Sequence, residues 1–151
     1  MIAVATVNAA SRRGVLRAGA RVWPCAIGHG GIRARKREGD GGSPRGTWRM
    51  VEVWYRPDRV KRPRAGLPVR ALGPCEGWCD APGNRNYNRA VRLPYPASAE
   101  MMWRADGLYD LGVVIDYNLC PRVHGRGSAI FLHVARRSEE RRVGKECRIG
   151  C

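Results

Sequence analysis

At 151 residues, the chain is long enough for one domain that buries about two-thirds of its unfolded surface. Its 28 Lys and Arg residues against 13 Asp and Glu give a formal net charge of +15, and the arginines are spread over the whole sequence. No nucleic-acid-binding motif accompanies them, so the charge indicates a solvated basic surface rather than a specific nucleic-acid interface. No run of about 18 apolar residues predicts a membrane span, and no signal peptide is visible at residues 1–10.

Short strands separated by long loops are predicted along the first half of the chain. Ile, Val and Thr in residues 1–10 favour a strand, and residues 15–16 and 21–27 favour further short strands. Residues 28–46 hold seven glycines, too many for a regular element, and form a predicted loop. Alternating apolar side chains at 47–55 indicate a half-buried strand.

The second half is predicted to contain one helix and the strongest strands. Four prolines in 56–74 indicate a long surface excursion, and 77–88 has turn composition with a tryptophan that pins it to the core. Residues 98–104, SAEMMWR, are predicted to be a short helix capped by their serine. The continuous apolar run within 108–117 predicts a buried strand.

A glycine-flanked turn leads at 125–134, GRGSAIFLHV, into a last apolar run that ends near His133. The run is short and contains β-branched and aromatic residues, so it predicts a buried strand. The sum is a mainly β fold, an antiparallel β-sandwich or open barrel with one or few short helices and long Gly/Pro-rich loops.

His133 has two interpretations at the end of a core strand. It can be a core histidine held by one backbone carbonyl, or a general base, because neutral imidazole titrates nearest to working pH. One histidine alone does not decide between them.

The cysteines allow a weak metal hypothesis. Cys75 and Cys79 have C-x3-C spacing, which could begin a zinc site, but no second pair of that kind follows. Buried thiols or a disulfide are favoured for these two and for Cys25 and Cys120.

Four segments occur in an order that resembles the L,D-transpeptidase catalytic domain, also called the YkuD domain. They are KREGDGGSPRG at 36–46, GWCDAPGNRNYN at 77–88, LYDLGVVIDYN at 108–118 and GRGSAIFLHV at 125–134. The resemblance covers residues 2–136 and is closest to the small, stand-alone bacterial members. It implies a β-sandwich, peptidoglycan stem peptides as substrates, a location in the periplasm or cell envelope, and no metal or organic cofactor.

The resemblance also implies a Cys/His mechanism with His133 as the general base. The family's cysteine nucleophile follows about 12 to 18 residues later, in a T-x-G-C or S-H-G-C turn. The segment after Arg136, RSEERRVGKECRIGC, holds no such turn and looks like the conceptual translation of a sequencing adapter. We therefore expect residues 1–136 to be a catalytic domain incomplete at its C-terminus, and 137–151 to be an adapter-derived tail. Cys151 is a disfavoured candidate nucleophile, and the chain as written is expected to be inactive.

Five further residues are candidates for substrate binding by family position, although each could be purely structural: Lys36, Asp40, Gly46, His124 and Ser128. Two alternatives for the whole chain stay open. One is a non-catalytic basic module that binds anionic wall polymer or nucleic acid, and the other is a small zinc protein that uses Cys75 and Cys79.

Overall fold

The computed structural model describes residues 2–6, 8–134 and 147–150, the last four by their backbone alone. Its strands are β1 (Ile2–Ala5), β2 (Arg13–Ala18), β3 (Arg21–Ile27), β4 (Ile32–Arg33), β5 (Ser43–Pro44), β6 (Met50–Tyr55), β7 (Val69–Ala71), β8 (Glu76–Cys79), β9 (Arg89–Arg92), β10 (Ala99–Met101), β11 (Leu111–Ile115), β12 (Phe131–Val134) and β13 (Cys147–Gly150). They form an eight-stranded sheet in the order β1-β2-β3-β13-β12-β11-β6-β7, a three-stranded sheet β10-β8-β9, and the pair β4-β5.

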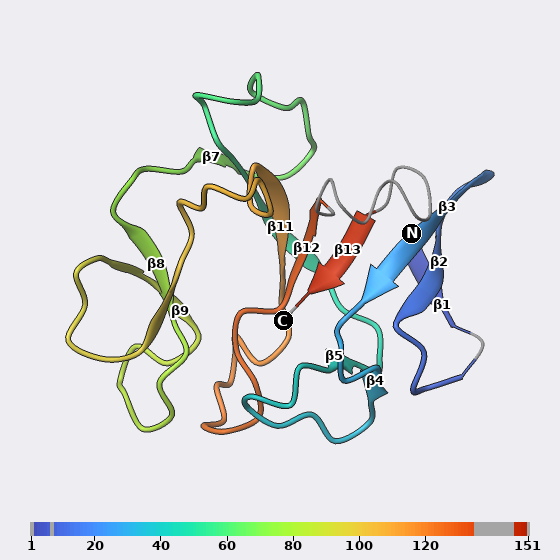
Figure 1. Cartoon of the computed structure of the whole chain (residues 1–151), viewed down its shortest axis with the longest axis horizontal. Helices are drawn as coiled ribbons and strands as arrows, with labels where there is room; N and C mark the ends of the chain where they lie inside the picture. Colours follow the sequence, from blue (N-terminus) through green and yellow to red (C-terminus); the bar gives the residue numbers. More distant parts are fainter. Residues whose placement is uncertain (1, 7, 135–146, 151) are drawn as a thin grey trace.

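The three-stranded sheet packs against one face of the large sheet, as β8 and β9 beside the central strands show in Figure 1. Aromatic rings carry this contact. The ring of Phe131 on β12 lies 4.6 Å from that of Trp54 on β6 and 5.0 Å from that of Trp78 on β8, both edge-on. Edge-to-face aromatic pairs stabilise a core beyond the area that they bury, so this cluster is the centre of a β-sandwich.

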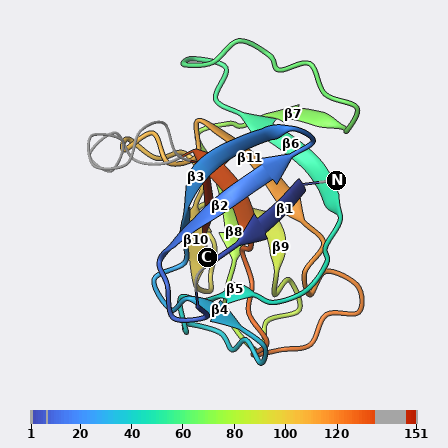
Figure 2. The same cartoon turned by 90° about the vertical axis from the view of Figure 1, so that its right-hand side faces the viewer.

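The opposite face of the large sheet carries a second, smaller apolar cluster. Leu16 and Ile27, from β2 and β3, pack there with Leu132 of β12. Figure 2 shows β1 to β3 curling across this face. The two end strands of the sheet, β1 and β7, are not paired with each other, so the described strands form an open sheet rather than a closed barrel. The predicted mainly β fold with antiparallel pairing is confirmed, with parallel pairs at β13–β3, β6–β7 and β4–β5.

The helix predicted at 98–104 is wrong. Residues Ala99–Met101 are strand β10, in which Glu100 lies opposite Trp78 of β8, and the N–H of Met102 donates to the carbonyl of Glu76 at 2.9 Å. A helix of seven residues is marginal by itself because its first turn is costly to nucleate. The open edge of β8 supplies backbone partners at once, so pairing overrides the helix propensity. The described residues contain no helix, and therefore none that could span a membrane.

Other boundaries also differ from the predictions. The strand expected at 108–117 is shorter, β11, and the predicted surface excursion and glycine-rich loop include the short strands β7, β4 and β5. The turn-like segment at 77–88 begins as strand β8, and its tryptophan does anchor it, because Trp78 Nε1 donates to Asn88 Oδ1 at 2.9 Å. Within the tail left out of the expected fold, β13 pairs with both β3 and β12.

Candidate functional site

His133 lies on β12 with its side chain turned into the sandwich core and only 4% of the residue exposed. Its Nδ1 lies 2.9 Å from the carbonyl oxygen of Val134. A carbonyl oxygen can only accept a hydrogen bond, so this contact assigns the imidazole proton to Nδ1. Nε2 is then the basic nitrogen of the neutral ring, and a backbone group fixes both the tautomer and the ring orientation.

Tyr109 forms one wall beside His133. The two rings meet edge-on with centroids 5.3 Å apart, and the Tyr109 hydroxyl donates to Glu100 at 2.6 Å. A guanidinium nitrogen of Arg104 lies 3.8 Å from the same carboxylate. Burial raises the pKa of Glu100, and burial together with the neighbouring Glu100 charge raises the pKa of Tyr109. The phenol therefore stays protonated and works as a fixed donor, which holds the ring against His133.

Trp54 and Gly112 form the floor beside His133. The three residues are in register across β6, β11 and β12 and share one face of the sheet. A Cβ on Gly112 would lie 2.3 Å from the indole carbon Cζ2 of Trp54. Gly112 is therefore required at this position because the indole lies over its backbone, next to the imidazole.

Lys36 and Asp40 form a nearly buried ion pair in the glycine-rich loop. Lys36 Nζ donates to Asp40 Oδ1 at 2.7 Å, and the backbone N–H groups of Arg37 and Gly42 donate to the same carboxylate at 2.7 and 2.9 Å. Partial burial opposes ionisation of Asp40, but these hydrogen bonds outweigh it and lower its pKa. These contacts of the carboxylate all lie within its own loop.

The same loop is tied to the segment before β12 through Tyr87. The hydroxyl of Tyr87 is hydrogen-bonded to Glu38, and it accepts from the N–H of Gly127 at 3.0 Å. The Glu38 N–H donates to the carbonyl of Gly125 at 2.9 Å, and the ring of His124 stacks on Tyr87 at 5.1 Å. Three sequence segments therefore meet at one tyrosine.

Asn88 anchors the start of β12. Its Oδ1 accepts from Trp78 Nε1 and from the N–H of Ala129 at 2.9 and 3.1 Å. Its Nδ2 donates to the carbonyls of Tyr117 and Asn118 at 3.2 and 2.9 Å. Asn88 is buried and has a φ of 55°, a left-handed conformation that asparagine tolerates better than most residues. Both polar atoms of this side chain are used, and they join the segment that leads to His133 to β8 and to the turn at 117–118.

The predicted site residues therefore fall into separate groups. Lys36 and Asp40 pair within the loop that Glu38 joins to Tyr87, and His124 stacks on the Tyr87 ring. Ser128 is buried in the adjacent stretch before β12. His133 lies further along that stretch, among Tyr109, Trp54 and Gly112. Gly46 lies apart, under the ring of Trp48, and Cys151 lies outside the described residues.

Sequence reasoning missed the groups that surround His133. The Val134 carbonyl is a backbone atom and has no sequence signature, and Tyr109 was included in the LYDLG motif without a role. Asn88 could have been noticed from its place at the end of the N-x-N-Y-N segment at 84–88, since asparagine is enriched at positive φ.

Cys75, Cys79 and Cys120 are free thiols, so none of them forms the disulfide that was one of the two interpretations. Of these three, Cys79 is buried. The disulfide interpretation is wrong for these three residues, and the buried-thiol interpretation holds for Cys79. Within residues 2–6 and 8–134, no cluster of three or more His, Cys, Asp or Glu side chains could hold a metal ion.

A cavity of about 760 Å³ lies on the other face of the large sheet. Adjacent residues of a strand point to opposite faces. Leu132 lines this cavity, whereas His133 points into the sandwich core. The cavity and the histidine are therefore separate sites on one strand.

A protein-family model, described as the YkuD L,D-transpeptidase catalytic domain, matches residues 3–150, nearly the whole chain. The chain belongs to the YkuD family. YkuD domains act on peptidoglycan, and their proteins are typically enzymes of the cell envelope, so the resemblance found in the four sequence motifs is confirmed at the family level. No curated protein and no solved structure matches the chain significantly.

Proposed function

We propose that the domain performs L,D-transpeptidase acyl transfer on peptidoglycan stem peptides, with His133 as the general base for a cysteine nucleophile. The observation that supports this most directly is the hydrogen bond between His133 Nδ1 and the Val134 carbonyl, because it makes Nε2 the proton acceptor. A core histidine held by one carbonyl is the competing interpretation, and the family membership favours the base.

In the proposed reaction, Nε2 of His133 takes the proton of the cysteine thiol. The thiolate attacks the carbonyl that precedes the terminal D-alanine of a stem tetrapeptide, and the tetrahedral intermediate collapses to a thioester. The bond to D-alanine breaks, and the imidazolium returns the proton to its leaving amine. The amine of a second stem then attacks the thioester, passes its proton to His133, and releases the thiolate as the new amide bond forms.

The environment of His133 supports this role by holding the imidazole still. Tyr109 and the Trp54–Gly112 pair restrict the ring, and Asn88 fixes the segment from which β12 starts. A base whose geometry is set before the substrate arrives avoids reorganisation during the reaction.

We further propose that residues 137–151 do not contain the native nucleophile. The segment after Arg136 lacks a T-x-G-C or S-H-G-C turn, and Cys151 is preceded by Arg-Ile-Gly. On this proposal residues 1–136 form the domain up to its base, and the 151-residue chain does not turn over substrate.

The deciding experiment begins with re-sequencing the source gene from native DNA across the codons after Arg136. We expect a T-x-G-C or S-H-G-C turn about 12 to 18 residues beyond His133, as cysteine acyltransfer requires a nucleophile within reach of its base. The encoded protein should form a covalent adduct with a carbapenem-type acylating agent, detected by intact-protein mass spectrometry. His133→Gln should abolish the adduct, while His29→Gln, which changes an exposed histidine, should leave it.

The 151-residue chain provides the complementary test. Incubated with the same agent, it should gain no mass at Cys151, because the flanking sequence does not form the family's turn. Stoichiometric acylation of Cys151 would contradict the proposed loss of the nucleophile.

A further inference from the structure

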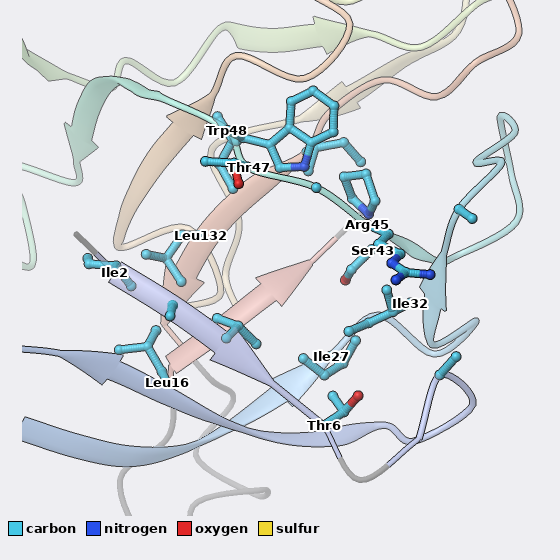
Figure 3. Close-up of a pocket in the computed structure, with 18 of the residues that line it drawn as sticks. Ile2, Thr6, Leu16, Ile27, Ile32, Ser43, Arg45, Thr47, Trp48 and Leu132 are labelled. Atoms are coloured by element: carbon cyan, nitrogen blue, oxygen red, sulfur yellow. The ribbon is translucent and has the colours of Figure 1, made fainter.

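The cavity behind β12 is lined by residues that the proposed reaction does not use. Its wall is contributed by one strand after another of the curled sheet, including Val4 of β1, Leu16 of β2, Ile27 of β3 and Leu132 of β12. Figure 3 shows Ile2, Leu16, Ile27 and Leu132 facing the segment of Thr47 and Trp48 across it. Curled β-sheets that present inward apolar side chains in this way enclose small ligands in many proteins.

The size and opening of the cavity suit a small molecule. A volume of about 760 Å³ lies within the ordinary range of ligand pockets. Three large apolar residues that line it remain open to solvent: Ile2 and Trp48 are each 40% exposed, and Met50 is 38% exposed. Solvent-exposed apolar side chains that gather at one cavity indicate a surface that binds a partner.

The charges on the lining have one sign. Arg45 and Arg49 line the cavity and are exposed, and the described lining residues include no Asp, Glu or Lys. Neither guanidinium forms an ion pair within the described residues. An apolar interior with two unpaired guanidinium groups is complementary to a long aliphatic chain that carries an anionic head, since guanidinium binds carboxylate and phosphate oxygens well.

A second copy of the chain fits this surface poorly. Two copies with a formal charge of +15 each would bring like charges together at the two arginines, and like-charge juxtaposition disfavours association.

We propose that this cavity binds a single-chain amphiphile with an anionic head, with its aliphatic chain among Val4, Leu16, Ile27 and Leu132 and its head at Arg45 and Arg49. The inference does not rest on the proposed acyl transfer, because Leu132 and His133 face opposite sides of the sheet.

The test is calorimetric titration of the purified 151-residue chain with dodecyl phosphate and, separately, with dodecanoate, each below its micellar concentration. Saturable binding near one equivalent is expected for at least one of the two, and the tighter of the two identifies the head group. Lengthening the chain should tighten binding by about fourfold per methylene while the cavity has room, because each buried methylene contributes about 0.8 kcal/mol. Inorganic phosphate alone and dodecyltrimethylammonium should bind far more weakly.

Matched arginine variants separate the proposed head-group site from general basic charge. Arg45→Gln with Arg49→Gln should weaken anion binding roughly tenfold, as the loss of charge-assisted hydrogen bonds predicts. Arg17→Gln changes an exposed arginine on β2 that does not line the cavity, and should leave the affinity unchanged. The variants change exposed side chains, so folding is expected to survive and is checked by thermal unfolding.

Three results would overturn the proposal. Equal affinity for dodecyltrimethylammonium would show that Arg45 and Arg49 do not select an anionic head. An affinity that does not depend on chain length would show that the aliphatic chain does not enter the cavity. A dimer on size exclusion that binds neither anion would assign the surface to a second copy. None of these results bears on acylation of the re-sequenced protein, so the two proposals fail independently.

Discussion

At the scale of single residues, Gly112 shows how a position without a side chain can determine the geometry of a site. The residue lies between Trp54 and His133 in the sheet register, and the indole occupies the space where a Cβ would be. Glycine is needed at this position to leave room for the Trp54 ring and not to adopt a special backbone conformation, because Gly112 has no positive φ. The Trp54 ring can therefore occupy the space over the Gly112 backbone, beside the imidazole.

Gly112→Ala should destabilise the fold by about 1–3 kcal/mol, the usual cost of overpacking a core. It should also shift the imidazole NMR resonances of His133, because Trp54 must move. Gly66→Ala is the matched control, since a Cβ there meets no atom within 4 Å, and it should change stability by less than about 0.5 kcal/mol. Urea unfolding of both variants checks this, and equal effects at the two glycines would refute the packing argument.

At the scale of structural elements, the loop from Lys36 to Gly42 is held by charge rather than by an apolar core. Asp40 joins Lys36 to two backbone N–H groups, and Glu38 joins the loop to Tyr87. The loop therefore supports the Gly125–Gly127 turn that precedes β12. We interpret Lys36 and Asp40 of the motif as structural residues that hold this loop in its conformation.

The stability of this loop should depend on pH in the acid range. The pKa of Asp40 is lowered from 3.8 in the folded state, so its ionisation stabilises the fold above pH 3.8. That contribution is lost as the pH falls through the lower, folded pKa. A double-mutant cycle of Lys36→Met and Asp40→Asn, followed by urea unfolding, should show a favourable coupling free energy at pH 7 that declines below pH 3.8. A coupling that does not change with pH would contradict the ionic origin.

At the scale of the whole molecule, the formal charge of +15 is not balanced by the acidic groups of the fold. Several Asp and Glu side chains form ion pairs with nearby Arg and Lys, for example Glu52 and Glu76 with Arg70. The excess arginines repel one another over distances that salt screens, with a Debye length of about 10 Å at 0.1 M. Repulsion of this kind lowers the stability of the compact state.

Raising the salt concentration from about 0.01 to 0.3 M should therefore raise the melting temperature of the chain, because screening weakens the net repulsion. The double variant Arg17→Glu with Arg89→Glu lowers the formal charge by four, from +15 to +11, at two exposed positions. Its melting temperature should respond less to salt in calorimetric scans. A larger response in the variant would show that the repulsion does not limit stability.

Part of the molecule could be predicted from local sequence because local residues determine it. The apolar runs around Val113 and Phe131 specify buried strands by composition alone, and the seven glycines of 28–46 exclude long regular elements there. The motif order indicated the YkuD family, which the family match confirms. The role of His133 stays a prediction, supported by the family and by the ring's environment.

The tertiary structure decided the features that depend on contacts between residues far apart in the sequence. Residues 99–101 became a strand because β8 offered a free edge, although their side chains favour a helix. The tautomer of His133 depends on a backbone carbonyl, and its neighbours Tyr109 and Gly112 reach it only through strand register. Composition and periodicity report burial and local conformation, whereas register, cavity walls and hydrogen-bond partners depend on which segments meet. For that reason the sequence alone indicated the family and the candidate base. Only the fold revealed the cavity with Arg45 and Arg49 on the opposite face of the sheet from His133.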